Sequence, residues 1–93
     1  MTYVLVARIP AEGVAAFRGY EELVLPVLAE HGGRLERRLV SDDERVEVHI
    51  VWFPSAVAFA GYREDPLRAA HAKLLARSCA ALELLELRDL PVP

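Results

Sequence analysis

The sequence VEVHIVWFPS, residues 46–55, decides the fold, because it combines the pattern of a β-strand with a helix start. Alternate residues of a strand point to opposite faces of its sheet. One face here is entirely apolar and consists of Val46, Val48, Ile50 and Trp52. The other face is mixed and consists of Glu47, His49, Val51 and Phe53. We therefore expect the apolar set to face the protein's own helices and the mixed set to lie on the opposite side of the sheet.

The rest of the chain divides into strand and helix patterns around this segment. Short β-rich segments predict further strands over residues 2–9, 34–40 and 81–90. Apolar residues at helical spacing predict helices over 11–31 and 56–79. Pro26 predicts a kink or a restart in the first helix, and Asp65-Pro66 predicts a restart of the second, with the aspartate as its N-cap.

The resulting order β-α-β-β-α-β is that of an α+β ferredoxin-like fold with a four-stranded antiparallel sheet. Residues 1–93 are expected to form a single domain. Right-handed crossovers place both helices on one face, so the other face has no cover from the chain itself. In the hairpin, Leu35 and Leu39 are expected on the face of Val46, so paired residue numbers sum to an odd value.

The composition limits the classes of partner. Hydrophobic residues make up 54% of the 93 residues, a surplus that favours self-association as a homodimer through the uncovered sheet face. The net charge of −3 gives no basic surface for nucleic acid, and no apolar run is long enough to cross a membrane. Cys79 is the only cysteine and is expected to be buried; a cytoplasmic location follows as the default expectation.

Two stretches, LPVLAEHGGRL (25–35) and HIVWFPSAVAFAGYREDPLRAAHAKLLARS (49–78), resemble a family of small bacterial domains of unknown function in the dimeric α/β-barrel superfamily. Relatives of that family include cofactor-free antibiotic-biosynthesis monooxygenases and muconolactone isomerases. The resemblance implies two sheets packed face to face in a dimeric barrel, with His49 looking into the barrel. The chain departs from the pattern at Trp52, where relatives often carry a carboxylate, and at Arg68, where an aromatic residue is common.

The candidate site centres on His49, which the hairpin places near three charged residues, namely Glu36, Arg38 and Glu47. A carboxylate beside an imidazole forms an acid–base pair suited to enolisable substrates. The alternative is charge pairing between strands, on a face closed by the partner subunit. Trp52 and Tyr62 are large enough either to line a ligand pocket or to fill the core.

Three classes of function remain open from the sequence. The first is a module that binds a small organic metabolite in the barrel or in a sheet–helix cavity. The second is a cofactor-independent monooxygenase or isomerase that uses His49 on an aromatic or enolisable substrate, and the third is a structural or regulatory dimer without a ligand. No cofactor is expected, and the spacing of the three histidines does not favour a metal site.

Overall fold

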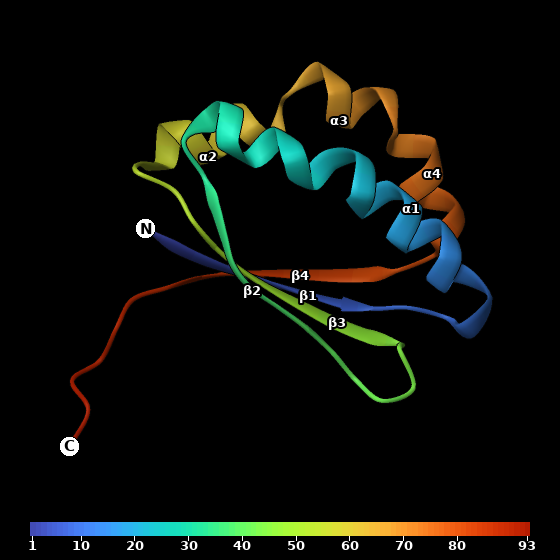
Figure 1. The fold of residues 1–93 in the computed structure, drawn as a ribbon, viewed down its shortest axis with the longest axis horizontal. Coiled ribbons are helices and arrows are strands. Elements are labelled where there is room, and N and C mark those ends of the chain that lie inside the picture. The colour runs from blue at the N-terminus through green and yellow to red at the C-terminus, as the bar shows by residue number, and fades with distance from the viewer.

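The computed structural model describes residues 1–93 and has the predicted ferredoxin-like arrangement (Figure 1). The elements, in chain order, are β1 (Thr2–Arg8), the 3₁₀ helix η1 (Ala11–Gly13), α1 (Val14–Val24), the 3₁₀ helix η2 (Leu25–His31), β2 (Arg34–Val40), β3 (Val46–Trp52), α2 (Ala56–Arg63), α3 (Pro66–Ala70), α4 (Ala72–Ser78) and β4 (Ala81–Leu87). The strands form one antiparallel sheet in the order β2-β3-β1-β4. All helices lie on one side of this sheet, and the other side is open (Figure 1).

The helices break at Pro26 and at Asp65-Pro66, where the sequence predicts, and at His71 between α3 and α4, where it does not. α1 gives way to η2 at Leu25, directly before Pro26, which has no N–H to continue the α-helical bonding. The hydroxyl of Ser55 caps α2, and the carboxylate of Asp65 caps α3 by accepting a hydrogen bond from the backbone N–H of Leu67. The predicted interruption at Pro26 and the predicted restart at Asp65-Pro66 are therefore confirmed. No helix combines the length and the apolar character that a membrane crossing requires.

Two apolar clusters fill the space between the sheet and the helices. The larger cluster consists of Tyr3, Val27, Leu28, Val51, Phe53 and Tyr62. The smaller cluster consists of Ala7, Ile9 and Phe17. Because Tyr3 lies near one end of β1 and Ala7 near the other, the clusters occupy opposite ends of the covered face. His49 of β3 lies opposite Leu5 in the middle of that face, and Glu47 lies opposite Ala7, beside the smaller cluster.

The predicted facing of β3 is wrong. Glu47, His49 and Val51 are buried on the helix side, whereas Val48 and Ile50 are half-buried on the open side. The strand is anchored by its apolar end, since Phe53 is completely buried among aromatic neighbours. The rule that the more apolar face turns inward fails here because Glu47 and His49 form a hydrogen bond with each other and Arg38 binds the same carboxylate, as described below. His49 consequently lies under the helices, and not on the face that a second sheet would cover.

The hairpin between β2 and β3 also differs in part from the prediction. Near the turn, Arg38 lies opposite His49 and Leu39 opposite Val48, so the paired numbers sum to an odd value as expected. A bulge between Leu35 and Arg37 then shifts the register by one residue. Leu35 therefore lies on the helix side and Leu39 on the open side, and the expectation that they share a face is wrong.

The open face of the sheet is largely apolar. Its apolar residues, by strand register, are Val4, Val6, Leu39, Val46, Val48, Ile50, Trp52, Leu85 and Leu87. Arginines lie at its margin, where the guanidinium of Arg34 sits 4.2 Å from the centre of the Trp52 ring system. No segment of the chain covers this face, as the sequence predicted.

Cys79 is exposed, so the expectation that it is buried is wrong. It follows Ser78, the last residue of α4, and adopts a left-handed backbone conformation with φ 55° that ends the helix. A residue at this position lies past the apolar stripe of the helix, and for that reason its side chain is not drawn into the core.

The close approach of α4 to η1 and α1 can be tested at two glycines, Gly13 in η1 and Gly19 in α1. A Cβ at Gly13 would lie 1.9 Å from the backbone oxygen of Ser78, so Gly13→Ala should lower the free energy of unfolding by about 1–3 kcal/mol through overpacking. A Cβ at Gly19 meets only Leu74, at 3.6 Å, and alanine is preferred to glycine inside helices. Gly19→Ala should therefore raise the free energy of unfolding by about 0.5–1 kcal/mol. Urea unfolding followed by circular dichroism measures both. Equal effects of the two substitutions would contradict the packing described.

Candidate functional site

Three ionisable side chains are buried on the covered face of the sheet, in and beside the gap between the two apolar clusters. Glu47 and His49 project from β3 and are each 2% exposed, and Glu21 projects from α1 and is 3% exposed. Ionisable groups are seldom buried to this degree unless they are paired. The contacts among these three residues therefore determine whether the arrangement is stable.

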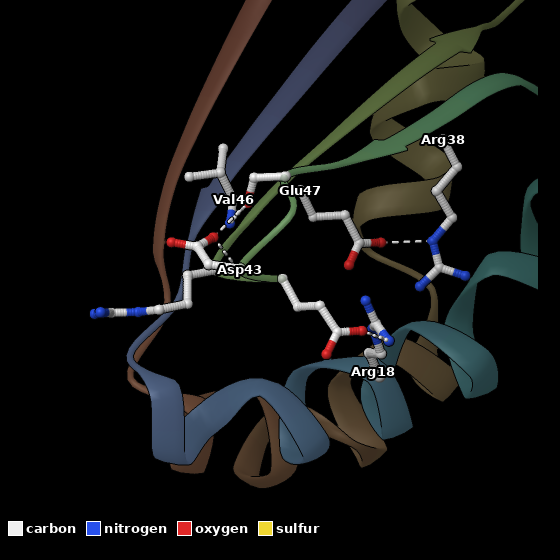
Figure 2. Close-up of polar contacts among 8 residues, drawn as sticks. Arg18, Arg38, Asp43, Val46 and Glu47 are labelled. Atoms are coloured by element: carbon white, nitrogen blue, oxygen red, sulfur yellow. Dashed lines mark hydrogen bonds and ion pairs between the residues drawn. The ribbon is translucent and has the colours of Figure 1, made fainter.

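The first contact is a hydrogen bond between His49 and Glu47, whose Nε2 and Oε1 atoms are 2.6 Å apart. Arg38, which lies opposite His49 on β2, donates its Nε–H to the same carboxylate oxygen (Figure 2). An ionised carboxylate only accepts hydrogen bonds, so His49 donates through Nε2–H. The second oxygen of Glu47, Oε2, is buried without a partner. Glu47 thus fixes the orientation of the imidazole and is itself held by Arg38.

Glu21 lies on the other side of the imidazole. Its Oε2 atom is 3.5 Å from Nδ1 of His49, so the ring stands between two carboxylates. Glu21 occupies the buried stripe of α1, between the buried residues Tyr20 and Val24. The packing of that helix therefore holds Glu21 against the sheet.

The two carboxylates differ in pKa. Burial and then the negative charge of Glu47 raise the pKa of Glu21 from 4.5 to about 7, although Arg38 and Arg68 partly offset the rise. Burial alone would also raise the pKa of Glu47, but the hydrogen bonds from His49 and Arg38 outweigh it and hold that pKa below its ordinary value. Near neutral pH, Glu47 is therefore ionised, whereas Glu21 is present in both its protonated and its ionised form.

His49 and Glu21 line a cavity of about 210 Å³ between the sheet and the helices. Ten of its fourteen lining residues are hydrophobic. The polar members are Glu21, His49, Arg63 and Arg68. Leu82 and Leu84 of β4 also line the cavity and are 48% and 41% exposed, so the cavity opens toward the β4 edge of the sheet. Glu47 does not line the cavity and lies behind His49.

Two arginines border the cavity without an acidic partner. The guanidinium of Arg68, on α3, lies 4.5 Å from the ring centre of Tyr62, and that of Arg63, at the end of α2, lies 5.7 Å from the ring centre of Phe59. Neither arginine takes part in an ion pair. Burial raises the pKa of Tyr62 to about 12 against the opposing effect of Arg68, so the phenol stays protonated. The cavity wall therefore contains a neutral phenol beside a cation.

The structure brings some of the predicted site residues together and separates others. Arg38 and Glu47 lie beside His49, as predicted, and Tyr62 forms part of the cavity wall. Glu36 is displaced by the bulge in β2, and it lines a shallow open-face hollow together with Trp52. These two residues are not near His49, because the open face and the covered face are separated by the sheet itself.

Sequence reasoning missed Glu21 and Arg68. A signal for Glu21 was present, since it is the one carboxylate that falls between Phe17, Tyr20 and Val24 on the apolar stripe of its helix. Arg68 stood out in the sequence only as a departure from the family pattern, and its position at the cavity depends on how α3 restarts at Pro66. No three His, Cys, Asp or Glu side chains are arranged so that they could hold a metal ion.

No protein-family model and no curated protein sequence matches this chain, but solved structures share its fold. Rv0793 from Mycobacterium tuberculosis superposes with a TM-score of 0.69 at 19% identity, over 99% of this chain and 100% of that one. A candidate antibiotic biosynthesis monooxygenase from Nitrosomonas europaea gives 0.71 at 15% identity, over 92% and 97%. SnoaB, a cofactor-independent oxygenase from Streptomyces nogalater, gives 0.68 at 20% identity, over 96% and 93%. The likeness confirms the ferredoxin-like fold expected from the sequence, and the neighbours include proteins of the antibiotic-biosynthesis monooxygenase type.

The raised pKa of Glu21 predicts a dependence of stability on pH. A carboxyl with a folded-state pKa of about 7 binds its proton more tightly than in the unfolded chain, where the pKa is 4.5. The stability from this protonation is complete below pH 4.5 and is lost as the pH rises through 7. Relative to Glu21→Gln, the wild type should lose about 2–3 kcal/mol between about pH 5 and pH 8. Urea unfolding of both proteins across this range measures the difference, and a constant difference would contradict the burial of an ionisable Glu21.

Proposed function

We propose that this chain binds a small organic molecule in the cavity between its sheet and helices and transfers a proton to or from it, without a cofactor. The observation that carries the proposal is the lining of the cavity. Most of the lining is apolar, but it includes His49 and Glu21, which contact each other there. Largely apolar cavities with a few convergent polar groups are typical of small-molecule sites.

The volume of the cavity limits the size of the ligand. An apolar cavity of about 150 Å³ accommodates benzene, so 210 Å³ is suited to one ring with a few substituents. Fused polycyclic molecules exceed this space. The hydrophobic lining favours an aromatic or alicyclic ring, in agreement with the aromatic or enolisable substrates that the sequence suggested.

The hydrogen bonds of His49 define which nitrogen would act. Glu47 accepts the proton of Nε2 from behind, and Nδ1 faces Glu21 on the cavity side. Nδ1 is then the nitrogen that takes a proton from an acidic C–H or O–H group of the ligand, while ionised Glu47 stabilises the imidazolium that forms. Glu21, with its pKa of about 7, is suited to return a proton to the product or to pass one to solvent.

The likeness to SnoaB supports this proposal. SnoaB is a cofactor-independent oxygenase of the same fold, so chemistry without a bound cofactor is compatible with this arrangement of sheet and helices. The identity of 20% carries no further detail of substrate or reaction to this chain, since fold alone does not define a function.

Exchange of hydrogen for deuterium at the α-carbon of cyclohexanone tests the proton transfer. We expect the wild type to accelerate this exchange in D₂O, and His49→Gln to reduce the acceleration by at least about 100-fold, because general-base catalysis commonly contributes that much. Proton NMR follows the loss of the α-hydrogen signal. His71→Gln is the matched control, since His71 does not line the cavity, and it should retain the wild-type rate.

Titration of the same proteins with cyclohexanone, followed by amide chemical shifts, separates binding from chemistry. Shifts confined to the cavity residues together with exchange that depends on His49 support the full proposal. Saturable binding with an exchange rate equal in the wild type and His49→Gln would reject the proton transfer. Absence of any binding to the cavity would reject the site itself.

We also propose that a second copy of the chain covers the open face of the sheet, which would form the barrel that the sequence resemblance implies. The apolar residues of that face extend across all four strands, and the sheet is covered on its other side alone. Contiguous apolar surfaces of this kind are rarely left in water. Two identical faces related by a twofold axis bury the same residues from each copy.

Sedimentation at micromolar concentration should therefore give twice the chain mass of 10.3 kDa. Ile50→Arg places a charge in the middle of the open face and should yield a monomer with a native circular dichroism spectrum. Val57→Arg is the control, since Val57 is 82% exposed on α2 and lies outside the proposed interface. A monomeric wild type with a native fold, or an Ile50→Arg variant that stays dimeric, would contradict this assembly.

A further inference from the structure

Arg68 has a polar atom that nothing in the chain satisfies. Its Nε–H is buried and has no hydrogen-bond partner, and the side chain makes no ion pair. An unpaired buried donor on a charged group is costly, and in native proteins such groups commonly mark a site for a ligand or ion. Arg68 also lines the cavity. The residue that carries this donor therefore borders the candidate site, although its Nε atom is itself shielded from the cavity.

The packing around Arg68 holds the guanidinium in place. The guanidinium carbon Cζ of Arg68 lies 4.5 Å from the ring centre of Tyr62. Tyr62 is buried and belongs to the larger apolar cluster. An arginine held against an aromatic ring keeps its N–H groups free to bind a planar anion through two parallel hydrogen bonds. The arrangement is thus already organised for a carboxylate.

The charges around the cavity are not balanced within the chain. The charge of Glu47 is matched by Arg38 behind the cavity, in contact with the same oxygen that bonds His49. Glu21 makes its contact with His49 and is partly protonated near neutral pH. Arg68 and Arg63 remain as cations at the cavity without carboxylate partners. The local excess is positive although the whole chain carries a net charge of −3.

From this we infer that the ligand of the cavity is a small monocyclic carboxylic acid, whose carboxylate binds Arg68 while its ring occupies the apolar part of the cavity near His49. This inference rests on the proposed function and adds the class of ligand to it. Arg68 would then be the residue that selects acids over neutral molecules of the same shape.

Benzoate and benzamide test the inference, because they have nearly the same size and differ in charge. Isothermal titration calorimetry at pH 6 should show the wild type binding benzoate at least about 10-fold more tightly than benzamide, as expected for charge-assisted hydrogen bonds. Arg68→Gln should reduce this preference to less than about 2-fold, chiefly by weakening the binding of benzoate. Arg68→Lys keeps the charge but loses the two-pronged geometry, so it should give an intermediate preference.

Arg77→Gln is the matched control, because Arg77 is exposed on α4 and does not line the cavity; it should bind both compounds like the wild type. Circular dichroism confirms that each variant is folded. Equal binding of benzoate and benzamide by the wild type would overturn the inference and leave the cavity as a site for neutral molecules. A preference for benzoate that persists in both Arg68 variants would assign the anion site elsewhere, and binding of neither compound would reject the inference together with the proposed site.

Discussion

The rest of the structure depends on the hydrogen bond between His49 and Glu47. Burying the mixed face of β3 would be unfavourable if either side chain lost its partners, since an unpaired buried ionisable group costs several kcal/mol. The 2.6 Å contact, together with the bond from Arg38, removes most of that cost. It allows Val51 and Phe53 to enter the core on the same face. The consequence on the other side of the sheet is an apolar surface that the helices cannot reach.

The same interaction divides two nearby carboxylates into different roles. Glu47 accepts two hydrogen bonds and stays ionised, whereas Glu21 makes only the longer contact with Nδ1 of His49, and burial with the charge of Glu47 raises the pKa of Glu21 to about 7. Environments that push two pKa values apart are characteristic of acid–base sites. Because the cavity lies on the Glu21 side of the imidazole, the group that exchanges protons is the one that faces a ligand. Arg68, with its unsatisfied Nε–H, adds a fixed positive charge to the same cavity.

Much of the fold was predictable from the sequence, because prolines and helix caps act locally. The break before Pro26 and the restart at Asp65 fall where those residues require them. Hairpin geometry likewise placed Arg38 and His49 together without knowledge of the helices. The face of β3 was not predictable from hydrophobicity, since a pair of polar residues that bond each other can be buried in preference to an entirely apolar set. Glu21 and Arg68 reach the site only through the packing of helices against the sheet. The displacement of Glu36 depends on a bulge in β2 that the sequence of this strand does not reveal.

The ring nitrogens of His49 offer the most direct test of the central claim, that a histidine buried under the helices donates to Glu47 and presents its other nitrogen to the cavity. Protein labelled with ¹⁵N at histidine and studied by NMR near pH 8 reports the proton on each nitrogen. The structure predicts that Nε2 of His49 carries a proton, with a proton resonance shifted downfield by a short hydrogen bond and lost in Glu47→Gln, and that Nδ1 is the nitrogen whose shift responds to Glu21→Gln. A His49 protonated at Nδ1 alone, or one whose ring protons exchange freely with water and ignore both substitutions, would contradict the buried pair and the site built on it.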